Sequence, residues 1–302
     1  MRAREFSFAR YVAKQEGAGE EFRPTEYAYS GDLAMLRTFR QMKAVETAAA
    51  AAVRGYKQFL KNQYLGTTVR VGPRQLPRIH RIAERCAETL GVATPTVYVA
   101  NSPHVNAFTF GTDDDAFIVL HSALIDHFDE SELTFVIGHE TGHIQNCHVV
   151  YGTVLQLMKA SAAILLQWIL PPVEVALATW YRRAEITCDR AGLLCAQDIG
   201  VGTRALMKVA SGARTLYDEL DVEAYLEQYE EGRDGLGRIS EAFATHPYLP
   251  KRVQALRVFA ESALFREAVG LGKEGIGMAE VDRRTGEILQ ILGPSEAVKE
   301  RG

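Results

Sequence analysis

The chain has 302 residues, of which 47% are hydrophobic and 24% are charged, and its formal net charge is −4. This length and composition are typical of a globular chain with one large domain or two small ones. The acidic balance and the lack of a basic stripe argue against a nucleic-acid partner. Residues 1–17 contain no apolar run that resembles a signal peptide, so we expect a cytoplasmic protein whose four cysteines stay reduced.

The first predicted element is a long amphipathic helix over residues 31–62. Leu33, Leu36 and Phe39 recur at helical spacing, and the alanine run that follows consists of the strongest helix former. We expect this helix to belong to an N-terminal arm, residues 1–65, that packs on the main domain.

A small sheet and two helices are predicted in the next part of the chain. Runs of β-branched and aromatic residues favour strands, and amphipathic runs between them favour helices. The glycine at position 91 is expected to close the first of these helices, and Gly111 to begin a hairpin-like turn. The expected elements are a strand at 67–71, a helix at 76–90, strands at 96–100, 107–110 and 116–120, and a helix at 122–128.

The most informative motif is the pentapeptide from His139 to His143. Asp129 or Ser131 is predicted to cap the helix that carries it. On a helix, positions i and i+4 project from nearly the same face, so the two imidazoles can share one Zn²⁺. Glu140 would then lie beside the metal-bound water. The alternative is a surface helix with two unrelated histidines.

An apolar stretch follows the motif. Residues 160–173 carry no charge, but the stretch is shorter than a membrane span and is interrupted by Pro171 and Pro172. We expect a helical hairpin over residues 150–181 that is buried on the protein or in an oligomer interface through residues 160–181. The alternative is a shallow hairpin at a membrane surface.

A second pair of carboxylates stands farther along the chain. Glu185 and Asp189 are again separated by four residues, so a helix would place both on one face. Glu185 would complete a His₂Glu ligand set, and Asp189 would accept the outer N–H of a ligand histidine, His139 in the first instance. The alternative is an exposed helix with routine charge pairs.

The C-terminal third is less informative. The segment 218–231 has seven acidic residues, which favours a solvated helix face; the alternative is a mobile flap near the site. Residues 279–292 are predicted to form a hairpin around residues 284–286. The remaining histidines lack ligand spacing and are expected to be structural or at the surface; they are His80, His104, His121, His127 and His148.

Four blocks together resemble the zinc metalloendopeptidases of the HtpX and CaaX prenyl protease type, the gluzincins of family M48. The resemblance covers residues 66–258. Its blocks are Asn106-Ala107-Phe108 with Gly111, then His139-Glu140-Thr141-Gly142-His143, then Glu185 with Asp189-Arg190, and finally Thr245-His246-Pro247 with Arg252-Val253.

The resemblance implies an α+β fold, mostly α, with a small β-sheet beside the helix of the two histidines and a second ligand helix. It implies a zinc metalloprotease domain over residues 66–260, followed by a C-terminal extension, 261–302. One Zn²⁺ per chain would be held by His139, His143 and Glu185. Polypeptide substrate would pair with the strand that contains Asn106, Ala107 and Phe108.

The expected reaction is peptide-bond hydrolysis by metal-activated water, with Glu140 as general base. His246 is expected to donate to the oxyanion or to occupy the open zinc position; alternatively it only caps the turn before Pro247, and Tyr248 is a competing donor. A role in protein quality control or maturation is the leading hypothesis. The alternative is a weak or latent zinc-stabilised chaperone or binding module, with a terminal arm over the cleft.

One departure concerns the membrane. Members of the family commonly carry transmembrane helices, including a hairpin between the two ligand blocks, whereas residues 160–181 are too short and too interrupted to span a bilayer. We therefore expect a soluble or peripheral relative, cytoplasmic or associated with a membrane surface.

Overall fold

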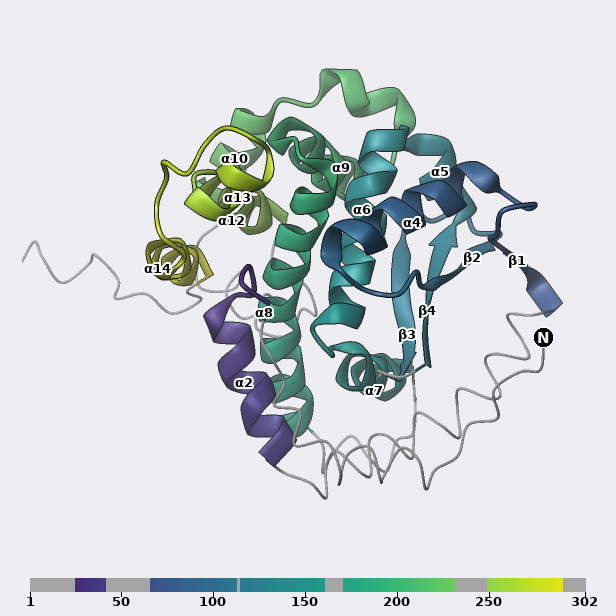
Figure 1. The fold of residues 1–302 in the computed structure, drawn as a ribbon, viewed down its shortest axis with the longest axis horizontal. Helices are drawn as coiled ribbons and strands as arrows, with labels where there is room; N and C mark the ends of the chain where they lie inside the picture. The colour runs from purple at the N-terminus through teal and green to yellow at the C-terminus, as the bar shows by residue number, and fades with distance from the viewer. Residues whose placement is uncertain (1–24, 42–65, 113–114, 161–170, 232–248, 290–302) are drawn as a thin grey trace, which may run out of the picture.

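The computed structural model describes residues 25–41, 66–112, 115–160, 171–231 and 249–289. Within them a four-stranded sheet lies beside a larger group of helices, which confirms the predicted α+β, mostly helical class (Figure 1). The strands are β1 (Thr68–Arg70), β2 (Thr96–Ala100), β3 (Ala107–Thr112) and β4 (Asp115–His121). The helices are α2 (Ser30–Gln41), α4 (Pro77–Leu90), α5 (Ser122–His127), α6 (Glu130–Gln145), α7 (Val149–Ala160), α8 (Pro171–Ala196), α9 (Ile199–Ser211), the 3₁₀ helix η1 (Arg214–Glu219), α10 (Val222–Glu231), α12 (Leu249–Ala260), α13 (Ala263–Ala268) and α14 (Met278–Leu289).

The sheet has the order β1-β2-β4-β3, so β3 is the last strand in the part of the sheet that the structure describes. β2 runs parallel to β4, and the other two pairs are antiparallel. The predicted hairpin between β3 and β4 is confirmed. It requires Gly111, because this residue has φ 127° and a Cβ there would lie 2.4 Å from the carbonyl oxygen of Asp115.

Local signals set the ends of the two helices that pack together beside the sheet. α4 ends at Gly91, as predicted, with φ 68° and its N–H directed to the carbonyls of Ala87 and Glu88. At the start of α6, Asp129 is the cap: its carboxylate accepts from the amide of Glu132 at 2.9 Å, and Glu132 accepts from the amide of Asp129 at 3.0 Å. This reciprocal capping box decides between the two predicted caps.

Helices α6 and α8 form the centre of the molecule, and glycines let them approach closely (Figure 1). A Cβ on Gly142 would lie 2.7 Å from the Cβ of Ala191, and a Cβ on Gly192 would lie 2.6 Å from the carbonyl oxygen of Phe135. Neither position has room for a side chain, since real Cβ atoms do not come so near. This close packing places residues 135–142 of α6 against residues 191 and 192 of α8.

Helix α2 packs along α8 and corresponds to the first part of the helix expected over residues 31–62. Leu36 is buried with Trp180 of α8 and Tyr151 and Leu155 of α7. Residues 42–65 lie outside the described residues. The arm, domain and extension boundaries at 65 and 260 remain predictions.

The predicted apolar hairpin corresponds to α7 and the start of α8, which contact one another. α8 begins at Pro171, because proline is well suited to the first turn of a helix, where its missing N–H has no partner to lose. The turn of the hairpin, residues 161–170, lies outside the described residues. Among the residues that the structure describes, no helix is long and apolar enough to cross a membrane.

The acidic segment forms η1 and α10, and α10 is anchored to the domain. Leu226 is buried in the main core, and Glu223 pairs with Arg257 of α12 at 2.7 Å. Asp218, Glu219, Asp221 and Glu227 are exposed, as the first of the two interpretations predicts.

The predicted hairpin at 279–292 is wrong, because α14 runs as one helix through residues 284–286. Val281 and Thr285 are buried four residues apart, which is helical spacing. Arg283 and Arg284 pair with Glu280, and Arg283 also pairs with Glu287 one turn later. These pairs favour helix over the turn that the glycine at position 286 suggested.

The glycine contacts lead to a stability prediction. Gly142→Ala should lower the free energy of unfolding by about 1–3 kcal/mol, because the overpacking of α6 on α8 outweighs the better helix propensity of alanine. Gly286→Ala is the matched control in α14, where the nearest atom to a new Cβ is 3.5 Å away. It should be neutral or stabilise by about 0.5–1 kcal/mol. Urea unfolding of both variants without metal measures this, and equal effects would contradict the packing argument.

Candidate metal centre

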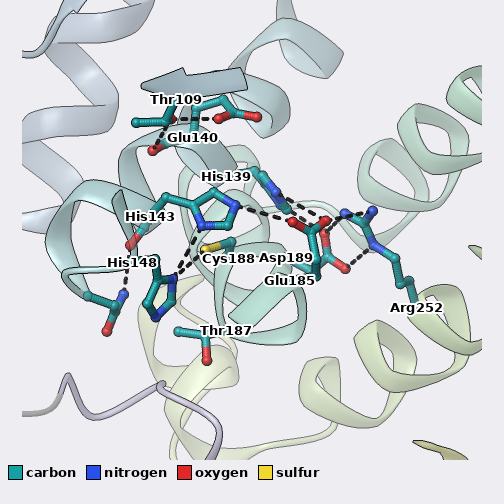
Figure 2. Close-up of polar contacts among 12 residues, drawn as sticks. Thr109, His139, Glu140, His143, His148, Glu185, Thr187, Cys188, Asp189 and Arg252 are labelled. Atoms are coloured by element: carbon teal, nitrogen blue, oxygen red, sulfur yellow. Dashed lines mark hydrogen bonds and ion pairs between the residues drawn. The ribbon is translucent and has the colours of Figure 1, made fainter. Parts of the chain in front are cut away.

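Two helices bring the predicted ligands together. His139 and His143 lie one turn apart on α6, and Glu185 faces them from α8 (Figure 2). Nε2 of His143 is 3.3 Å from Oε1 of Glu185, and Nε2 of His139 is 3.7 Å from Oε2. All three residues are buried, with at most 7% of the surface of each exposed.

This arrangement fits a zinc ion. Bonds of about 2.0–2.1 Å in a tetrahedral site separate neighbouring ligand atoms by roughly 3.3 Å. The measured separations of 3.3 and 3.7 Å are near that value. Two neutral imidazoles and one carboxylate are the donor set of a catalytic zinc site that keeps one position for water. His139, His143 and Glu185 are therefore residues that could hold a metal.

Asp189 lies behind the first ligand, one turn after Glu185 on α8. Its Oδ1 is 3.0 Å from Nδ1 of His139, so the aspartate accepts a hydrogen bond from Nδ1, the ring nitrogen that faces away from Glu185. Burial disfavours a charge on His139, but the hydrogen bond to Asp189 and the charge of Glu185 outweigh it and raise the pKa of His139. This is the contact that the spacing of the two carboxylates predicted.

Arg252 of α12 joins both carboxylates of α8. Its Nε and Nη2 donate to Asp189 at 2.8 and 2.6 Å, and its Nη1 lies 2.9 Å from Oε2 of Glu185. Burial favours the protonated form of Asp189, but Arg252 and His139 outweigh it and lower the pKa of Asp189. The guanidinium therefore supplies one buried positive charge to two neighbouring buried carboxylates.

The second ligand has different neighbours. Burial lowers the pKa of His143, although Glu185 opposes this shift, so the ring is neutral as a metal ligand must be. The ring of Tyr181 stacks on that of His143 with centroids 5.4 Å apart and planes at 8°. Burial raises the pKa of the Cys188 thiol well above its usual range, so this nearby group is neutral as well.

The side chain of Glu140 lies on the other side of the ligands, toward the sheet (Figure 2). The hydroxyl of Thr109 on β3 donates to Oε2 of Glu140 at 2.6 Å and contacts its carbonyl oxygen at 3.1 Å. The contact therefore joins the motif helix to β3.

The predicted substrate strand is β3, which begins at Ala107, directly after Asn106. Toward its other end, the amide of Gly111 donates to Thr153 of α7 at 3.3 Å. β3 is thus the end strand of the described sheet and the strand that contacts Glu140, and its side chains at Phe108 and Thr109 point to opposite faces. Substrate binding by this strand remains a prediction.

The sequence interpretation missed part of the surroundings. His148 was expected to be one of several structural or surface histidines, yet it is fully buried with Nδ1 3.3 Å from Nδ1 of His143. Its position five residues after His143, outside the helical spacing, gave no signal. Asp32 and Tyr181 were also missed. His246, together with the neighbouring Thr245, Pro247 and Tyr248, lies outside the described residues.

Comparisons with known proteins point to one family. A family model described as Peptidase family M48 matches residues 73–260. A plastoglobule-localized metallopeptidase 48, chloroplastic, from Arabidopsis thaliana is 38% identical over 176 residues, which are 57% of this chain and 51% of that protein. A Protease HtpX homolog from Helicobacter pylori is 29% identical over 215 residues, 60% of this chain and 66% of the homolog.

A third relative is the mitochondrial metalloendopeptidase OMA1 of Arabidopsis thaliana, 30% identical over 191 residues that cover 60% of this chain and 35% of that protein. The chain therefore spans between about a third and two thirds of the length of these relatives. No solved structure matches the chain.

The role of Arg252 can be tested by comparison with another arginine of the same helix. Arg252→Met leaves Glu185 and Asp189 buried without their cation, so we expect the free energy of unfolding of the metal-free protein to fall by about 3–5 kcal/mol. Arg257→Met, which removes an exposed pair with Glu223, should leave the urea midpoint nearly unchanged. Urea unfolding in the presence of a chelator measures both, and a loss below 1 kcal/mol for Arg252→Met would contradict this account.

Proposed function

Because the chain belongs to peptidase family M48, we propose that it is a zinc-dependent endopeptidase that hydrolyses peptide bonds of protein substrates. The observation that carries the proposal is the convergence of His139, His143 and Glu185, all buried, from two helices. Glu140 on the same helix adds a carboxylate that zinc binding does not require. Its presence favours an enzyme over a site that only stabilises the fold.

When bound there, zinc supplies a Lewis acid that polarises the scissile carbonyl and lowers the pKa of a coordinated water. In our proposal His139, His143 and Glu185 hold this ion, and Asp189 keeps His139 in the tautomer that binds it. Glu140 takes a proton from the attacking water and passes it to the leaving amine. Thr109 supports this role because its hydroxyl donates to the carboxylate and holds it in position on the sheet side of the ligands.

We further propose that the substrate main chain pairs with β3 along Asn106, Ala107 and Phe108. The position of β3 at the end of the described sheet supports this, as does the contact from Thr109 to Glu140. His246 is proposed as the donor to the oxyanion, on the basis of the family resemblance alone.

The proposed biological role is protein quality control or maturation in the cytoplasm, with residues 160–181 as the segment for a peripheral membrane or oligomer contact. The alternative is a zinc-stabilised chaperone or binding module with little turnover. The two differ in whether Glu140 matters, because a binding module needs the ligands but not the base.

The decisive experiment follows the cleavage of denatured casein by the zinc-loaded chain. Glu140→Gln should lower kcat/KM by about 10²–10⁴-fold while the bound zinc stays at one per chain, because the base is lost and the ligands remain. Glu130→Gln, an exposed carboxylate on the same helix, is the control and should be unchanged.

A chelator should abolish cleavage, and added zinc should restore it. Equal cleavage by the wild type, by Glu140→Gln and by the chelated protein would overturn the enzyme proposal. Stoichiometric zinc together with suppressed aggregation of a client protein, and without cleavage, would support the binding module instead.

A further inference from the structure

The second ligand histidine has a buried partner that connects it to the N-terminal helix. His148 lies between α6 and α7 with none of its surface exposed, and its Nδ1 is 3.3 Å from Nδ1 of His143 (Figure 2). On the other side of the same ring, Nε2 is 3.0 Å from Oδ2 of Asp32 on α2. This second contact is short but is an ion-pair contact rather than an in-line hydrogen bond.

The positions of the protons on these nitrogens follow from the role of His143 as a ligand. Nε2 of His143 faces Glu185, so a metal bound there leaves the ring proton on Nδ1. That proton can be donated only if Nδ1 of His148 offers a lone pair. The proton of His148 is then on Nε2, the nitrogen that lies 3.0 Å from the carboxylate of Asp32. One arrangement of protons thus places a donor opposite an acceptor at both contacts of His148.

The surroundings of Asp32, the last residue in this series of contacts, favour the ionised form of its carboxyl group. It has none of its surface exposed, and it accepts from Nε1 of Trp180 at 2.9 Å and from the hydroxyl of Thr187 at 2.7 Å. Burial would raise its pKa, but His148 and these two donors outweigh that effect and lower it. A buried anion 3.0 Å from an imidazole nitrogen polarises that ring.

We propose that Asp32 and His148 are positioning residues of the metal centre, which fix the ring and the tautomer of His143 and strengthen its donation to the metal. Asp189 contacts His139 directly. Asp32 would orient His143 in the same way, but through the imidazole of His148. Asp32 lies outside residues 73–260, the part of the chain that the family model matches. The N-terminal helix α2 is thereby part of the site.

A competing use of the same atoms is a second metal ion held by His143, His148 and Cys188, whose donor atoms all lie within 4.8 Å of one another. It is less consistent with the structure because Nδ1 of His143 would have to lose its proton as well. The Cys188 thiol, 3.5 Å from Nδ1 of His148, would also have to ionise in a fully buried position. The stoichiometry of zinc distinguishes the two arrangements.

The inference rests on the zinc site of the proposed function, and its test measures zinc binding without substrate. In the full chain, competition with a chromophoric chelator gives the zinc dissociation constant. We expect Asp32→Asn to raise it about 10-fold and His148→Phe about 10–100-fold. Visible absorption of the Co²⁺-loaded variants should shift as well, since it reports the ligand field and not the stability of the fold.

Tyr27→Phe is the matched control. Tyr27 is buried in the same N-terminal segment and its hydroxyl contacts Asn146 at 3.0 Å, so the variant loosens this segment but leaves Asp32 and His148 in place. It should lower the urea midpoint. Its zinc affinity should stay within twofold of the wild type, and its Co²⁺ spectrum should not shift. Cys188→Ala should likewise keep zinc affinity within twofold.

Unchanged zinc affinity in Asp32→Asn and His148→Phe would overturn the inference, and so would an equal loss in Tyr27→Phe. A second equivalent of zinc that disappears in Cys188→Ala would overturn it too, because His148 would then be a ligand. If the variants show the expected losses of zinc affinity but the wild-type chain does not cleave casein, only the proposed function is contradicted. A wild-type chain that binds no zinc would overturn both.

Discussion

The structure depends on the burial of four carboxylates in one small volume. Asp32, Glu140, Glu185 and Asp189 are each at most 6% exposed, and an ionised carboxylate in such a place is costly unless it is paired. Their partners come from several parts of the chain. α12 supplies Arg252 to two of them, β3 supplies a hydroxyl to Glu140, and Asp32 receives its donors from α8 and from the residue before α7. The arrangement of the outer elements follows from these pairings.

The pairings act only because α6 and α8 lie closer than side chains normally allow. Gly142 occupies the position just before the second ligand histidine, where a Cβ would meet Ala191 of α8. The same approach sets the separation of 3.3 Å between His143 and Glu185. A wider spacing would leave Glu185 out of reach of both imidazoles, so the glycine is a requirement of the site as much as of the packing.

The sequence predicts those features that depend on neighbours along the chain. The i, i+4 spacing identified His139 with His143 and Glu185 with Asp189, and local caps identified the ends of α4 and α6. Features that depend on distant segments were missed. α14 was taken for a hairpin because Gly286 suggested a turn, whereas ion pairs and burial against α2 and α12 hold it as a helix. Asp32 and His148 are far apart in sequence, and no periodicity connects them.

The N-terminal arm illustrates how contacts of this kind change a functional interpretation. An arm that covered the cleft would have to lie near β3, but α2 packs on α8 and α14, on the opposite side of α8 from the sheet (Figure 1). Without α2, the indole of Trp180 and the hydroxyl of Thr187 would lose the buried acceptor that both share, which costs on the order of 1–3 kcal/mol for each unsatisfied group. Residues 30–41 therefore support the metal centre from the side of α8 that faces away from the sheet. Inhibition by an N-terminal arm would have to involve other residues.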